Sequence, residues 1–133
     1  KMSWRNAVRE TAVKNLYLLA AGPGVKNASE LLSSKWMIQF LKDVKNEFGI
    51  VLFDSPPILP VTDATILASL VDGIVLIIKE GKTGKRNIKR SIELIRSVNG
   101  NLLGVVITGV QAGDLYGYRN YYRSYKIESN RKS

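Results

Sequence analysis

The stretch Ile50-Val51-Leu52-Phe53-Asp54-Ser55-Pro56-Pro57 decides the fold class that this sequence predicts. Four apolar residues lead straight into an aspartate, and two prolines follow shortly after. An unbroken apolar run is typical of a strand buried on both faces, as in a parallel sheet covered by helices. Asp54 would then stand at the carboxyl end of that strand, where open α/β sheets bind their ligands. A carboxylate there can hold a magnesium ion, directly or through water. The alternative is that Asp54 only caps a tight turn before the prolines.

Three further segments share the apolar character of residues 50–53 and also predict strands. They are rich in Val, Ile and Leu and do not alternate cleanly with polar residues, so each is expected to be buried on both faces. These segments are residues 16–20, 73–78 and 103–108. The carboxyl ends of parallel strands lie on one rim of a sheet, so the loops that follow are expected to meet there. The loops are residues 21–24, 54–57, 79–83 and 109–111.

Helical patterns fit between the predicted strands. An apolar stripe with helical spacing runs from Trp36 to Phe48 and stops at Gly49, and Ser29 or Ser33 could cap its start. These large apolar side chains are expected in the core.

Two more helices are predicted further along the chain. One begins at Thr62-Asp63, continues through residues 64–70 and ends at Asp72-Gly73. The other has an apolar stripe from Ile88 to Val98 and ends at Asn99-Gly100. Strands that alternate with helices predict an α/β fold with a doubly wound, mostly parallel sheet.

Composition excludes several kinds of site. The 133 residues include no cysteine and no histidine, which rules out disulfides, thiolate metal sites and a Ser-His-Asp triad. Any metal must be held by oxygen ligands, which favours magnesium. The net charge of +9 favours acidic partners. The cations gather in two clusters, Lys82, Lys85, Arg86, Lys89 and Arg90, and Arg119, Arg123, Lys126, Arg131 and Lys132. Each cluster alone is also typical of a solvated face.

The last part of the chain differs from the rest. Five tyrosines lie between Leu115 and Tyr125, interleaved with Arg119 and Arg123, and the final residues are polar and charged. The apolar residues here keep neither a strand nor a helix period, so residues 115–133 are expected to form a mobile tail. Residues 1–114 are expected to form the folded domain.

The order of the motifs resembles that of the bacterial tyrosine kinases of capsule and exopolysaccharide synthesis. The resemblance covers the chain from about Trp4 to Tyr125. It implies a P-loop ATPase fold like that of the MinD-type division-site ATPases, and use of ATP and magnesium. In that family Asp54 matches the third nucleotide-site motif, an aspartate that helps to bind magnesium and so serves catalysis. The matching pieces are residues 15–22, 29–34, 53–57, 61–64, 71–73 and 103–106.

The resemblance also assigns a role to the tail. The family's terminal tyrosines accept phosphate from neighbouring kinase domains in a ring, which would make the tail tyrosines phosphoacceptors. Two alternatives stay open, since tyrosines among arginines can stack on single-stranded nucleic acid, or form a neutral terminus. The candidate acceptors are Tyr116, Tyr118, Tyr121, Tyr122 and Tyr125.

The sequence departs from the family pattern at the nucleotide site. No Gly-x-x-x-x-Gly-Lys-Ser/Thr loop is present, and Gly81-Lys82-Thr83 is rejected as its remnant because Leu76 stands where the first glycine belongs. The second aspartate motif is also missing. The family's segment with both parts would precede Lys1, so we expect residues 1–114 to form a partial P-loop kinase domain that is truncated at its amino end, lacks a central strand and is inactive alone. Adenine recognition at Thr108 is doubtful, because threonine has less hydrogen-bonding reach than the asparagine often found there.

The sequence and the resemblance together predict part of an ATP- and magnesium-dependent protein-tyrosine autokinase that regulates capsule or exopolysaccharide synthesis and export. Asp63 would cap its helix or orient the loop before it. The expected partners are ATP, neighbouring subunits in a ring and a membrane adaptor. The expected location is the cytoplasmic face of the membrane, and nucleic acid is not an expected partner. The alternatives are a non-catalytic interaction module and a fragment of a ParA- or MinD-type ATPase.

Overall fold

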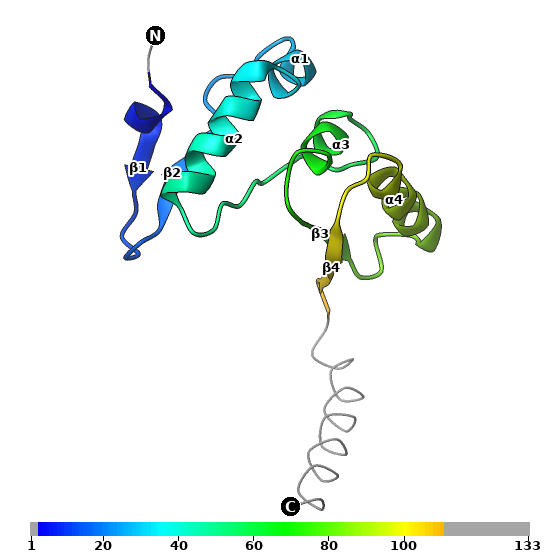
Figure 1. Cartoon of the computed structure of the whole chain (residues 1–133). Coiled ribbons are helices and arrows are strands. Elements are labelled where there is room, and N and C mark those ends of the chain that lie inside the picture. Colours follow the sequence, from blue (N-terminus) through cyan, green and yellow to red (C-terminus); the bar gives the residue numbers. More distant parts are fainter. Residues whose placement is uncertain (1–2, 111–133) are drawn as a thin grey trace, which may run out of the picture. The chain divides into compact units, whose positions relative to one another are not determined.

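The computed structural model describes residues 3–110, and it divides into two compact units, Lys1–Leu70 and Val71–Ser133. Figure 1 shows α helices and short strands along the described chain. None of the helices in residues 3–110 has the length and apolar character that crossing a bilayer requires. Each unit is best understood from its own core.

The first unit begins with a short hairpin. A 3-10 turn, η1 (Trp4–Ala7), leads into β1 (Val8–Glu10), which pairs antiparallel with β2 (Tyr17–Leu19) in the register Val8↔Leu19. All three residues of β2 are exposed. The predicted strand at 16–20 therefore exists, but the expectation that it is parallel and buried on both faces is wrong, because an adjacent hairpin partner supplies its hydrogen bonds.

Three helices complete this unit: α1 (Ala28–Leu32), α2 (Lys35–Glu47) and α3 (Asp63–Ala68). Ser34 caps α2, and its hydroxyl accepts a hydrogen bond from the Met37 amide at 3.3 Å. The expected caps at Ser29 and Ser33 are wrong, because Ser29 lies inside α1 and Ser33 is the residue that ends it. The buried side chains of the unit are Leu41, Val44, Ala64, Leu67 and Ala68.

Aromatic side chains tie the hairpin to α2. The Trp4 ring packs edge-on against Phe40 with centroids 5.6 Å apart, and the Tyr17 ring lies 5.4 Å from that of Phe48. The Trp4 indole also donates a hydrogen bond to Asp43 at 3.4 Å. The apolar stripe of α2 therefore packs as core at Leu41 and Val44, with Phe40 and Phe48 half-buried. The expectation is wrong for Trp36, which is 57% exposed because it lies in the first turn of α2, away from these contacts.

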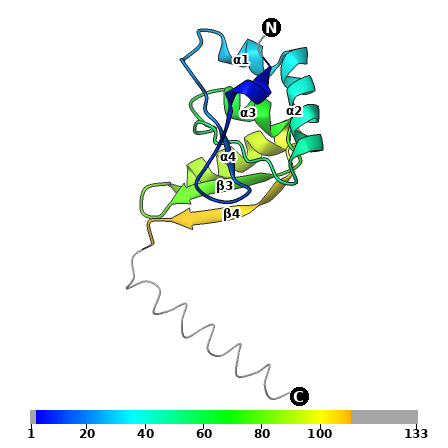
Figure 2. The same cartoon turned by 90° about the vertical axis from the view of Figure 1, so that its left-hand side faces the viewer.

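The second unit is a β-α-β arrangement, in which β3 (Ile74–Lys79) and β4 (Leu102–Thr108) pair in parallel and α4 (Lys85–Ser97) connects them. Figure 2 shows the two strands side by side with α4 along them. Both strands and the helix match the sequence predictions to within a few residues. Ile95 of α4 is fully buried, and Ser91 is buried one turn earlier.

The end of α4 explains why Asn99-Gly100 follows it. Asn99 has a left-handed φ of 56°, its amide donates to the Arg96 carbonyl at 3.0 Å, and the Gly100 amide donates to the Ile95 carbonyl at 2.9 Å. These two bonds form a Schellman motif, which closes the helix. A Cβ at Gly100 would lie 2.9 Å from the Ile95 carbonyl and 2.8 Å from the Ile74 side chain. Glycine therefore lets the helix end pack directly on β3.

One face of the two-stranded sheet is uncovered within the described residues. Side chains of paired residues in a parallel sheet point to the same face, so Val75 and Ile77 of β3 share a face with Gly104 and Val106 of β4. Ile77 is 66% exposed, and a Cβ added at Gly104 would meet nothing within 4 Å. The expectation that these strands are buried on both faces is therefore wrong in this structure, because α4 lies against the other face only. Even on that face Val105 and Ile107 of β4 are 43% and 54% exposed. A doubly wound sheet stays a prediction.

Candidate functional site

The segment around Asp54 has no regular secondary structure and pairs with no described strand. Residues 50–57 belong to no strand, and Ile50 and Leu52 are 82% and 90% exposed. The prediction of a buried strand at 50–53 is wrong for this structure. The physical reason is that a strand needs neighbours for its backbone amides and carbonyls, and no described strand lies against this segment.

Asp54 itself is exposed on this segment. The next residue is Ser55, whose hydroxyl donates a hydrogen bond to the neighbouring Pro56 carbonyl at 3.4 Å. Within residues 3–110 no group of three or more acidic side chains gathers to hold a metal ion. Asp54 could therefore contribute only one ligand to a magnesium ion, and water and phosphate oxygens would have to supply the others. The described residues also contain no phosphate-binding loop for ATP.

Asp63 lies in a small polar connection between two helices. The Ser29 hydroxyl on α1 donates to the Asp63 carboxylate at 2.8 Å, and it also lies 3.2 Å from the Thr62 hydroxyl. Because serine has one hydroxyl proton, Thr62 donates in the second contact. Thr62 is the residue before α3, and its side chain makes no capping bond. Asp63 therefore joins α3 to α1, and this role for Ser29 has no signal in the sequence.

The loop after β3 has a structural role that agrees with its rejection as a phosphate cradle. Gly81 adopts a left-handed φ of 67°, and the Thr83 amide donates to the Lys79 carbonyl at 2.9 Å. The Thr83 hydroxyl accepts from the Lys79 amide at 3.0 Å. The Thr108 hydroxyl is similarly occupied, because it donates to the Ile78 carbonyl at 3.2 Å. These hydroxyls stabilise the carboxyl ends of β3 and β4.

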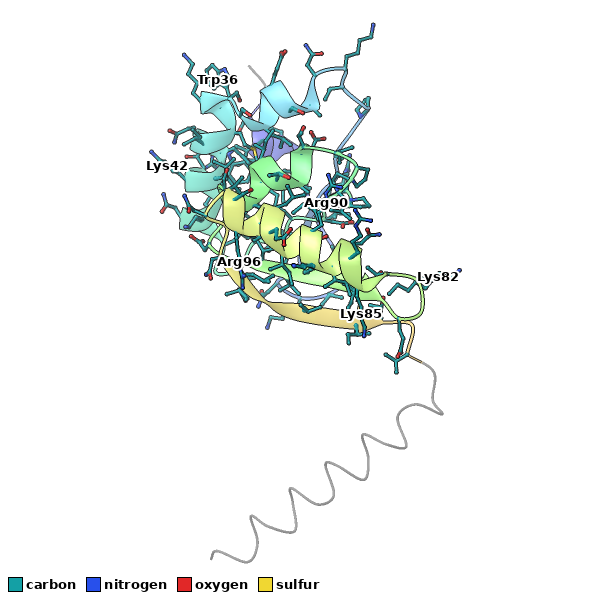
Figure 3. All side chains as sticks on the ribbon, turned by 90° about the vertical axis from the view of Figure 1, so that its right-hand side faces the viewer. Trp36, Lys42, Lys82, Lys85, Arg90 and Arg96 are labelled. Carbon is teal, nitrogen blue, oxygen red and sulfur yellow. The ribbon has the colours of Figure 1, made fainter. Side chains whose placement is uncertain are left out.

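Five cations form an exposed basic ridge on the loop and the first turns of α4. Four of them follow the helical spacing i, i+1, i+4 and i+5, which places them on one side of the helix. Lys89 forms a long ion pair with Glu93 at 3.9 Å. Figure 3 shows Lys82 and Lys85 near one end of α4 and Arg96 near the other. The basic ridge consists of Lys82, Lys85, Arg86, Lys89 and Arg90, all exposed.

The five candidate acceptors, Tyr116, Tyr118, Tyr121, Tyr122 and Tyr125, lie outside the described residues. So do the mobile tail predicted at 115–133 and the second basic cluster.

Comparison with known proteins begins with sequence relatives. No protein-family model matches the chain. The chain is 39% identical over 120 residues to the tyrosine-protein kinase YwqD of Bacillus subtilis, covering 89% of this chain and 51% of that protein. It is 33% identical over 122 residues to the putative tyrosine-protein kinase CapB of Staphylococcus aureus, covering 92% and 54%. ExoP of Rhizobium meliloti, a succinoglycan biosynthesis transport protein, is 27% identical over 139 residues, covering 96% and 18%.

Solved structures give the same picture. The tyrosine kinase domain of BceF matches with a TM-score of 0.76 at 35% identity, covering 83% of this chain and 46% of that one. The kinase domain of VpsO matches with a TM-score of 0.77 at 26% identity, covering 83% and 54%. The chain spans about half the length of YwqD and CapB. By sequence and by structure, this chain belongs to the bacterial tyrosine-kinase family.

Proposed function

We propose that this chain forms part of an ATP- and magnesium-dependent protein-tyrosine autokinase that regulates capsule or exopolysaccharide synthesis and export. The observation that carries the proposal is the 39% identity to a tyrosine-protein kinase across 89% of the chain. The printed names of CapB and ExoP connect such proteins with capsule and succinoglycan. The motif at 53–57 gives the chain a carboxylate suited to phosphoryl transfer.

The proposed reaction moves the γ-phosphoryl group of ATP to a tyrosine. The bond from the γ-phosphorus to the bridging oxygen breaks and leaves ADP, while a bond forms to the phenolic oxygen, which gives up its proton to solvent or a base. A bound magnesium ion would neutralise the charge that develops on the transferred group. Asp54 would help to hold that ion, and its exposure leaves its carboxylate oxygens accessible.

The five tail tyrosines are the proposed acceptors. Their spacing over ten residues lets each present a phenol to a neighbouring copy in turn. We place the protein at the cytoplasmic face of the membrane, assembled with copies of itself and with a membrane adaptor. Nucleic acid is not an expected partner.

A second candidate is a non-catalytic module that presents tyrosines to an intact kinase. It is supported by the absence of a Gly-x-x-x-x-Gly-Lys-Ser/Thr sequence and by the exposure of the segment around Asp54. A ParA- or MinD-type ATPase is less well supported, because such a function gives no role to the clustered tyrosines.

The test uses a longer polypeptide that joins this chain to a phosphate-binding Gly-Lys-Ser/Thr loop, incubated with magnesium and labelled ATP. Label should appear on tyrosine, fall at least about 100-fold with Asp54→Ala, and disappear when all five tail tyrosines become Phe. Glu10→Ala and Tyr17→Phe are matched controls at exposed positions outside the motif and the tail, and both should retain labelling. An unlabelled parent protein would refute the kinase proposal, and label in the five-Phe variant would refute the acceptor assignment.

A further inference from the structure

The basic ridge is the most strongly charged surface that the proposed function leaves without a role. Residues 79–90 contain six cationic side chains and one acidic side chain, Glu80. The apolar side of α4 packs inward through Ile95, so the ridge faces solvent. The long contact between Lys89 and Glu93 neutralises little of this charge, because their side chains are 81% and 60% exposed. The ridge therefore suits an anionic partner.

The chain leaves the sheet beside this ridge. Because β4 runs parallel to β3, its carboxyl end lies at the end of the sheet where the loop to α4 begins. The Glu80 amide donates to the Thr108 carbonyl at 2.9 Å, and a Cβ at Gly109 would lie 3.4 Å from side-chain carbons of Lys79. The described chain therefore ends at Val110, close to the loop that carries Lys82, and residues 111–133 follow it in the sequence.

The charge of those residues depends on phosphorylation. Residues 111–133 contain five cations, two acids and five tyrosines, which gives a net charge of +3. In this form the tail and the ridge repel each other. Each phosphotyrosine adds roughly −1.5 to −2 charges, so two already cancel the positive charge and five bring the tail to about −5 to −7. The attraction to the ridge is thus created by the modification.

The length of the chain permits the contact. Tyr116 follows Val110 by six residues, which span up to about 20 Å when extended. The four ridge residues on α4 extend over about 8 Å of helix axis. A tethered phosphate is also present at an effective concentration of about millimolar, which a separate anion must match. The tail is therefore favoured over an anionic lipid surface as the ligand of the ridge.

We propose that the basic ridge binds the phosphorylated tail of its own chain, through the phosphates on Tyr116 and Tyr118. The proposal rests on the proposed function, because it needs phosphotyrosine in the tail. Docking withdraws a phosphorylated tail from neighbouring copies, and dephosphorylation releases it. The ridge thereby makes tail availability depend on phosphorylation.

The test supplies the modification without any kinase. The 133-residue chain is produced with phosphotyrosine encoded at position 116, and the rate of its removal by a non-specific tyrosine phosphatase is measured. Each exposed charge pair contributes up to about 1 kcal/mol, or a factor of about five, so the triple variant K82A/K85A/R86A should lose phosphate at least about tenfold faster than the parent. The triple variant K26A/K42A/R96A removes the same charge from other exposed positions and should match the parent.

Two further measurements separate the outcomes. Protection should vanish in 0.5 M salt, where exposed charge pairs are screened, and should survive 100-fold dilution, because the contact is within one chain. Equal rates of phosphate removal in the parent and in K82A/K85A/R86A would overturn the proposal. Protection that is lost on dilution would also overturn it, because the phosphate would then bind the ridge of a neighbouring copy. Ridge-dependent binding of phosphatidylserine vesicles without phosphate protection would assign the ridge to a membrane instead. None of these results depends on kinase activity.

Discussion

Two isoleucines in the same unit offer a matched test of the uncovered sheet face. Ile95 on α4 is 0% exposed, whereas Ile77 on β3 is 66% exposed. Replacing a buried isoleucine with alanine costs about 2–5 kcal/mol, since it removes apolar contacts and leaves a cavity. At Ile77 only about a third of that burial exists, so Ile77→Ala should cost about 1 kcal/mol, including its lower strand propensity.

The prediction becomes stronger in a longer polypeptide. If the open face of β3 and β4 is an interior face of a longer protein, joining the chain to the part of the YwqD or CapB length that it does not span should bury Ile77. The cost of Ile77→Ala should then rise to about 2–5 kcal/mol, while the cost of Ile95→Ala stays unchanged.

Hydrogen exchange of the amides in β3 and β4 is the suitable assay, because it reports the opening free energy of this unit alone. In the 133-residue chain Ile95→Ala should lower protection by at least about 30-fold and Ile77→Ala by about fivefold, since each 1.4 kcal/mol is tenfold. A large loss for Ile77→Ala in this chain would contradict the observed exposure. An unchanged small loss in the longer polypeptide would refute the assignment of the face to the domain interior.

Three smaller predictions follow from single contacts. Asn99→Ala should lower stability by about 1 kcal/mol, because alanine has no local stabilisation of a left-handed φ, while Asn99→Gly should not, as measured by thermal unfolding. Thr83→Val removes the acceptor for the Lys79 amide and should speed exchange of that amide, at a cost of about 1 kcal/mol, whereas Thr83→Ser should preserve it. Ser29→Ala should destabilise the first unit by about 1 kcal/mol through loss of the bond to Asp63, and a change below 0.3 kcal/mol in urea unfolding would show that water replaces it.

The sequence predicted correctly those elements that are formed by contacts between residues close together in the chain. In the second unit the elements β3, α4 and β4 were predicted to within a few residues, since they are consecutive in the chain and Asn99-Gly100 ends α4 as expected. The parallel pairing of neighbouring strands through a helix needs nothing from elsewhere in the chain. The helix at 36–48 was predicted for the same reason, because its apolar spacing is a local property.

The failures involve partners that periodicity does not specify. The short strand β2 pairs with β1, a three-residue strand whose sequence Val8-Arg9-Glu10 has no clear apolar pattern. The contact of Ser29 with Asp63 joins residues 34 positions apart and could not be inferred from either local motif. Such contacts depend on how elements meet, which a single sequence does not record.

The segment at 50–57 separates what a sequence pattern encodes from what the described chain supplies. An apolar run that ends in Asp54 is consistent with burial on both faces, yet Leu52 is 90% exposed and the run pairs with no described strand. Natural sequences are locally consistent with the environment in which they fold, so this conflict points to neighbours that residues 3–110 do not contain. The same conflict recurs at Val75 and Ile77, whose face lies open. Since the chain spans about half the length of kinases that it resembles at 39% and 33% identity, the chemistry of Asp54 is best tested with those neighbours present.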